Sequence, residues 1–147
     1  MSEIQNLDIA GRWEVQRWEQ IYDDGRVTYP MGQELDGFME YGVNGMFCAI
    51  GKKGREAFTT GGQWNASDAE KAQAYMTYLT YAGDYEVQGN VVRHKVRHSL
   101  FPNWVGGEQK RFAELNGDVL QLTTHKLEAG TAEARVARLV FKRKSNV

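Results

Sequence analysis

The stretch "RHKVRHSLFPNW" (93–104) holds two of the chain's three histidines and one of its two prolines. Imidazole titrates near neutral pH and also binds metals, so this stretch is a candidate for acid–base catalysis or for metal binding. In a β-strand the side chains alternate, which places His94 and His98 on one face and Lys95 and Arg97 on the other. Because the charged face is most simply the solvated one, we expect both histidines to face inward.

The spacing of these histidines argues against a shared metal ion. Two strand residues four positions apart are separated by about 13 Å at about 3.3 Å per residue, whereas Zn–N bonds are about 2.0–2.1 Å long. His94 and His98 therefore cannot hold one zinc ion between them. We expect no metal site, with a site made of His125 and a carboxylate as the remaining alternative.

Other catalytic and cofactor motifs are missing from the sequence. It has no G-x-S-x-G nucleophile elbow, no P-loop and no G-x-G-x-x-G after a strand. Cys48 is the one cysteine, so it cannot form an internal disulfide. We expect no cofactor.

Glycine-containing turns divide the chain into short segments of the kind that form an antiparallel sheet. Each of the four clearest turns carries a glycine where a hairpin needs a positive φ angle: "DDGR" (23–26), "VNGM" (43–46), "VQGN" (87–90) and "LNGD" (115–118). The segments between the turns predict nine strands: 12–22, 26–30, 37–42, 46–51, 83–88, 91–100, 108–115, 119–125 and 136–144. Eight or nine strands predict an all-β barrel or sandwich.

One segment interrupts the strand pattern. Ser67 and Glu70 form a capping box, and good helix formers follow, so we expect one short helix over 67–79 that lies against the barrel. We expect the tyrosines of this region, Tyr75, Tyr78 and Tyr81, to be packing residues. The preceding glycine-rich stretch 51–65 predicts a long loop, and such loops are often lids or binding loops.

Size and charge limit the classes of function. The chain has 147 residues, of which 41% are hydrophobic and 25% charged, as expected for one globular domain spanning 1–147. Its formal net charge of −1 does not favour nucleic acid or an anionic membrane as partner. No signal sequence or membrane span is evident, so we expect a cytoplasmic protein.

Five segments, spread over nearly the whole chain, carry a recognisable pattern: "GRWEVQRWEQIYDDGRVTYPMG" (11–32), "FMEYGVNGMFCA" (38–49), "YAGDYEV" (81–87), "HSLFPNWVGGEQKRF" (98–112) and "LNGDVLQLTT" (115–124). Together and in this order they resemble the lipocalin-like domain family of small bacterial and fungal proteins. The element "LFPNWVG.EQ.R" is the most specific of these. The resemblance implies a single antiparallel barrel of about eight strands, in agreement with the turn count.

The resemblance also assigns individual positions. In the general lipocalin pattern an early G-x-W tryptophan packs against an arginine of the last strand, and Trp13 and Arg143 match these positions. The family has two adjacent histidines where this chain has His94 and Lys95, so only His94 carries over. His98 stands where the family has an aliphatic residue.

Strand alternation taken from the family match gives the candidate site. The expected catalytic residues are His94 as general acid or base, with Arg111 and Tyr85 binding an oxyanion. Expected ligand-binding residues are His98, Gln109, Trp104, Tyr41, Leu120 and Leu122. An inward Arg111 must be paired or solvated, so a salt bridge that closes one barrel end is the structural alternative.

Two functions from different classes fit this lining. The first is a cofactor-independent isomerase, cyclase, lyase or hydratase that acts on a hydrophobic or aromatic carbonyl compound; some fungal members of the family act as cyclases in polyketide pathways. The second is a carrier that only binds such a compound. Either way we expect a small hydrophobic or aromatic molecule as partner, no nucleic acid and no membrane, and we leave a homodimer open.

Overall fold

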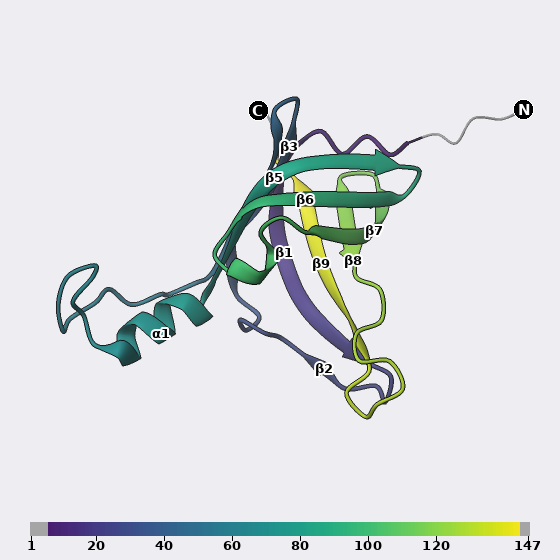
Figure 1. Cartoon of the computed structure of the whole chain (residues 1–147). Helices are drawn as coiled ribbons and strands as arrows, with labels where there is room; N and C mark the ends of the chain where they lie inside the picture. The colour runs from purple at the N-terminus through teal and green to yellow at the C-terminus, as the bar shows by residue number, and fades with distance from the viewer. Residues whose placement is uncertain (1–5, 145–147) are drawn as a thin grey trace, which may run out of the picture.

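The computed structural model describes residues 6–144. In chain order its elements are β1 (Gly11–Tyr22), β2 (Val27–Thr28), β3 (Leu35–Gly42), β4 (Gly45–Lys52), α1 (Asp68–Met76), β5 (Tyr78–Gln88), β6 (Val91–Ser99), the 3₁₀ turn η1 (Pro102–Trp104), β7 (Glu108–Asn116), β8 (Val119–Thr123) and β9 (Arg135–Arg143). Figure 1 shows the strands curving around one interior. The nine predicted strands are all present, with ends shifted by a few residues.

The sheet closes on itself. All neighbouring strands are antiparallel, in the order β2-β1-β3-β4-β5-β6-β7-β8-β9, and β1 also pairs with β9 from Trp13↔Arg143 to Tyr22↔Arg135. Eight strands therefore form a closed barrel, and β2 is an extra strand beside the end of β1. This is the barrel predicted from the turns and from the family resemblance.

The tight turns use glycine where no other residue fits. Gly45 starts β4 with a φ of 129°, and a Cβ atom built there would lie 2.3 Å from the carbonyl oxygen of Gly83. That separation is too short for a side chain, so β4 and β5 approach closely at this point.

One end of the barrel is closed by the first described residues. The indole of Trp13 is fully buried and donates a hydrogen bond to the carbonyl oxygen of Ile9 at 2.8 Å. The guanidinium carbon of Arg143 lies 4.2 Å from the Trp13 ring centroid. The predicted contact between these two residues is confirmed. The bond from Trp13 to Ile9, and a second bond from the Leu7 amide to the carbonyl oxygen of Gly89, hold residues 7–9 at this barrel end.

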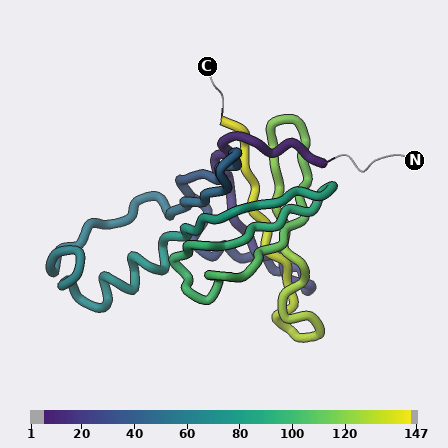
Figure 2. Tube along the Cα trace, turned by 45° about the horizontal axis from the view of Figure 1, so that its top comes forward, coloured from purple at the N-terminus to yellow at the C-terminus, as the bar shows by residue number. Residues whose placement is uncertain are grey.

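The helix does not lie against the barrel, and this part of the sequence prediction was wrong. Residues 53–77, which we call the protrusion, stand off the barrel as a loop followed by α1 in both views (Figures 1 and 2). No residue of α1 is buried. Ser67 caps the helix as predicted, accepting a hydrogen bond from the Glu70 amide at 3.3 Å. The helix ends at Met76 because the residues after it, rich in β-branched and aromatic side chains, continue as β5.

Within the described residues, no helix is long and apolar enough to cross a lipid bilayer.

Candidate functional site

Strand β6 places His94 in the barrel interior. The His94 side chain is 0% exposed, whereas Lys95 and Arg97 are exposed. Lys95 forms an ion pair with Glu86 at 3.1 Å, and Arg97 forms one with Asp84 at 2.7 Å, both on the outer face. The predicted alternation is thus confirmed for these three residues.

Two tyrosines hold the His94 ring between them. The Tyr41 hydroxyl on β3 lies 2.6 Å from His94 Nε2, and the Tyr81 hydroxyl on β5 lies 2.9 Å from His94 Nδ1. Both tyrosines are buried. We call Tyr41, His94 and Tyr81 the His94 triad.

The His94 triad has one more proton donor than it can use internally. A neutral imidazole has one N–H donor and one acceptor nitrogen, and each tyrosine has one O–H donor. The two hydrogen bonds of the triad use two of these three protons. The tyrosine that accepts from the imidazole N–H therefore keeps a hydroxyl proton for another acceptor.

Burial keeps the triad uncharged. Desolvation, together with a smaller effect of the positive charge of Arg111, lowers the pKa of His94 to about 3. Desolvation also raises the pKa of Tyr41 and of Tyr81 well above the ordinary value of a tyrosine. Near neutral pH the triad is thus a set of neutral hydrogen-bonding groups.

Arg111 and Gln109 lie next to the triad on β7. Gln109 pairs with His94 and Arg111 pairs with the buried Val92, so both side chains are on the inward face, where they are half-buried. Arg111 donates to the carbonyl oxygen of Lys110 at 2.9 Å and to Gln109 Oε1 at 3.3 Å. Among residues 6–144 it forms no ion pair with a carboxylate, so the salt bridge that was the structural alternative is not seen.

Each of the two tyrosines of the triad lies close to a further aromatic ring. The half-buried Tyr85 ring lies 4.8 Å from the Tyr41 ring, centroid to centroid. The Trp104 ring of η1 meets the Tyr81 ring edge-on, with the centroids 5.2 Å apart. Leu120 and Leu122 of β8 are fully buried in the same apolar core. This part of the barrel interior combines aromatic rings with a few polar groups, which is the composition typical of small-molecule sites.

His98 does not belong to this site, and its predicted inward position was wrong. Along β5 and β6, Ala82 pairs with His98 but Gly83 pairs with Val96, so Arg97 is an extra residue in a β-bulge. The bulge reverses the alternation after Val96 and turns His98 to the exposed outer face.

Tyr81 was missed as a site residue because the sequence analysis ended the helix too late. With the helix ending at Met76, residues 78–88 form one strand in which Tyr81 and Tyr85 share a face. The segment "TYLTYAGDYEV" (77–87), rich in β-branched and aromatic residues, was the sequence signal that indicated this strand.

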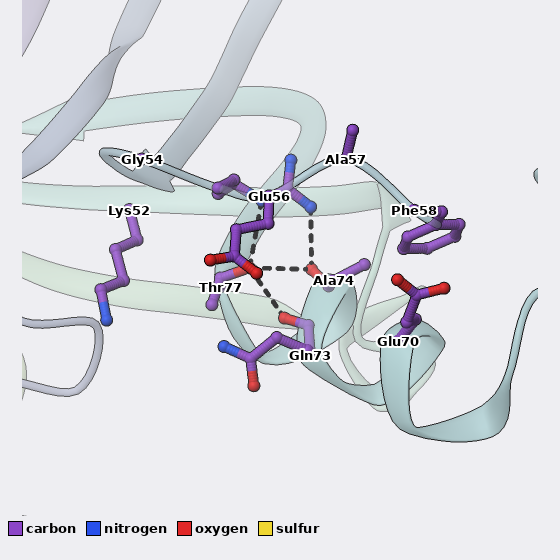
Figure 3. A pocket seen from close by; sticks show the side chains of 10 residues that line it. Lys52, Gly54, Glu56, Ala57, Phe58, Glu70, Gln73, Ala74 and Thr77 are labelled. Carbon is purple, nitrogen blue, oxygen red and sulfur yellow. Dashed lines mark hydrogen bonds between the residues drawn. The ribbon is translucent and has the colours of Figure 1, made fainter. Parts of the chain in front are cut away.

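A separate hollow of about 270 Å³ lies between the base of the protrusion and the end of β4 (Figure 3). Arg55 spans its wall, donating to Thr77 Oγ1 and to the carbonyl oxygen of Ala74, each at 3.0 Å. Its guanidinium therefore ties the loop at the start of the protrusion to the C-terminal end of α1. In the part of the chain that the structure describes, no three His, Cys, Asp or Glu side chains gather as a metal-binding group.

Comparison with known proteins assigns a family. The family model described as "Lipocalin-like domain" matches residues 10–144. One curated protein of Aspergillus oryzae, named 4'-hydroxy-3'-methoxypropiophenone carrier protein, is 35% identical over 80 residues, covering 48% of this chain and 72% of the relative. A crystal structure of a lipocalin-like protein from Bacteroides uniformis is similar with a TM-score of 0.49 and 14% identity, over 94% of this chain and 100% of the other.

Proposed function

The chain belongs to the lipocalin-like domain family, and from this premise we propose that it binds a small aromatic carbonyl compound at the His94 triad and acts as a carrier. The ligand carbonyl oxygen accepts the hydroxyl proton that the triad leaves unused. The aromatic part of the ligand lies against Tyr85 and Trp104.

The unused proton is the observation that supports this proposal most strongly. A buried hydroxyl without an acceptor is unfavourable by about 1–3 kcal/mol, so a ligand carbonyl that accepts the bond is selected over an apolar compound of the same shape. A ligand without an acceptor binds more weakly because it leaves the buried hydroxyl without a hydrogen-bond partner.

The charge state of the triad favours carriage over catalysis. A general acid or base works best with a pKa near the ambient pH, whereas burial holds the pKa of His94 at about 3. The isomerase, cyclase, lyase or hydratase function expected for His94, Arg111 and Tyr85 needs a group that gains and loses a proton during turnover. The Aspergillus oryzae relative named as a carrier also supports the binding function, and the compound in its name is an aryl ketone.

The proposal is tested with 4'-hydroxypropiophenone as the probe. Quenching of tryptophan fluorescence measures binding, and chromatography of the same incubations measures turnover. We expect saturable binding and unchanged ligand. Of Tyr41→Phe and Tyr81→Phe, the substitution that removes the unused hydroxyl proton should weaken binding about 3- to 10-fold, the range of one neutral hydrogen bond.

Tyr75→Phe is the matched control, because Tyr75 is an exposed tyrosine of α1 outside the barrel. It should bind the probe as the wild type does. Absence of binding would refute the proposal. Product formation that is lost in His94→Gln but kept in Lys95→Gln would establish the enzyme function in its place.

A further inference from the structure

We infer that the ligand carries a second, anionic oxygen, which Arg111 binds while the carbonyl oxygen is held at the His94 triad. The inference rests on the proposed function, because it concerns the same ligand at the same site. It narrows the ligand class from aromatic carbonyl compounds to those that also bear a carboxylate, an enolate or a phenolate.

Arg111 differs from the arginines of the neighbouring strand. On the outward face of β6, Arg93 forms an ion pair with Glu108 at 3.6 Å, and Arg97 forms one with Asp84 at 2.7 Å. Arg111 faces inward, is half-buried, and has no carboxylate partner among residues 6–144. Of these three arginines, only the one that faces the barrel interior is without a carboxylate partner.

The hydrogen bonds of Arg111 leave most of its donors free. A guanidinium has five N–H groups in a planar fork. Two bonds to Lys110 and Gln109 orient the fork, and both acceptors are uncharged. The remaining N–H groups suit an anionic oxygen, which forms shorter and stronger bonds with guanidinium than a neutral oxygen does.

The position of Arg111 connects it with the triad. Gln109, which accepts from Arg111, lies directly opposite His94 in the β6–β7 register. The positive charge of Arg111 also acts on the triad. It lowers the pKa of His94, as burial does, and it lowers the pKa of Tyr41 and of Tyr81, which burial raises. Arg111 is thus close enough to the triad for its charge to act there, and the inferred ligand would contact both the cation and the neutral donor.

Two pairs of probes test the inference by isothermal titration calorimetry. The first pair is 3-benzoylpropionate and its primary amide, which share the aryl ketone and differ in the carboxylate. The second pair is 4'-hydroxypropiophenone and 4'-methoxypropiophenone at pH 6 and pH 9, which differ in the ability to form a phenolate.

We expect the wild type to bind at least one anionic form about tenfold or more tightly than its neutral counterpart, as charge-assisted bonds do. A preference confined to the first pair identifies a carboxylate, and affinity that rises with pH only for the hydroxyl compound identifies a phenolate. Arg111→Gln should abolish the preference while leaving the amide affinity within about threefold. Arg111→Lys should keep part of the preference for the anionic probe, and the control Arg97→Gln should keep all of this preference.

Equal affinities within both pairs in the wild type would overturn the inference, as would a preference that survives in Arg111→Gln. In those cases binding of the neutral probes still supports the proposed function. If neither the neutral nor the anionic probes bind, the proposed function fails and the inference falls with it.

Discussion

Trp13 in the barrel and Trp64 in the protrusion have opposite surroundings. Trp13 is 0% exposed, bonded to Ile9 and covered by Arg143, whereas Trp64 is 81% exposed. The same contrast holds for the two regions as a whole. The barrel strands contribute one continuous buried apolar core, and α1 contributes no buried residue to it.

The two regions are consequently stabilised in different ways. In the protrusion the Glu70 carboxylate accepts hydrogen bonds from the amides of Thr59 at 2.9 Å and Thr60 at 3.0 Å, and also from the Thr60 hydroxyl. These bonds are local and exposed. The barrel depends on burial, so the site around His94 should keep its geometry when the protrusion is loosened.

The largest expected effect contrasts the two tryptophans. Trp13→Ala removes a fully buried side chain and should lower the free energy of unfolding by about 3–5 kcal/mol. Trp64→Ala should change it by less than about 0.5 kcal/mol, as usual for exposed positions. Urea unfolding followed by circular dichroism measures both, and similar losses in the two variants would contradict the contrast.

The next largest effect is the pH dependence of stability, which should differ between the barrel and the protrusion from pH 7 to pH 5. The pKa of His94 is about 3 in the folded chain and about 6.5 in the unfolded chain. Between pH 7 and pH 5 only the unfolded chain takes up a proton at this position, so the free energy of unfolding falls with falling pH, by about 2 kcal/mol.

His94→Gln should remove this dependence between pH 7 and pH 5, whereas His98→Gln at the exposed position should keep it. In the protrusion the bonds from Thr60 and Thr59 lower the pKa of Glu70 below its ordinary value. Its hydrogen bonds should therefore persist throughout this pH range. Stability that is flat from pH 7 to pH 5 in the wild type would contradict the account of His94.

The smallest effect on overall stability is expected from Glu70→Gln. This substitution weakens the charge-assisted bonds at Thr59 and Thr60, so these two amides should exchange with deuterium at least about tenfold faster. The free energy of unfolding should change by less than about 0.5 kcal/mol because the site is exposed. Faster exchange at His94 in β6 would show that the barrel depends on the protrusion after all.

The barrel itself could be predicted from the sequence because its signals are local. Glycine turns and alternating side chains define strands without knowledge of their partners, and the turns gave the correct neighbours. The contact between Trp13 and Arg143 followed from the family pattern. The inward position of His94 followed from alternation along its own strand, whereas those of Gln109 and Arg111 followed from alternation combined with the strand parity of the family match.

The errors arose where tertiary structure overrides local pattern. The bulge at Arg97 depends on the partner strand: Gly83 has no side chain, and a Cβ atom there would lie 2.0 Å from the carbonyl oxygen of Lys95. Nothing within the sequence of β6 marks it, so His98 was misplaced. The helix was expected against the barrel because the apolar residues of a short helix normally pack against another part of the protein. In the structure Tyr75 and Met76 are instead exposed.

The central claim is that a neutral His94 triad binds the ligand. It is tested most directly by ¹⁵N NMR of the histidine rings at pH 7 during titration with 4'-hydroxypropiophenone. We predict that His94 has the shifts of a neutral ring with and without the probe, and that its signals move on saturation. Signals of the exposed His98 and His125 should stay in place. An imidazolium at His94, or probe binding that leaves its signals unchanged, would contradict the claim.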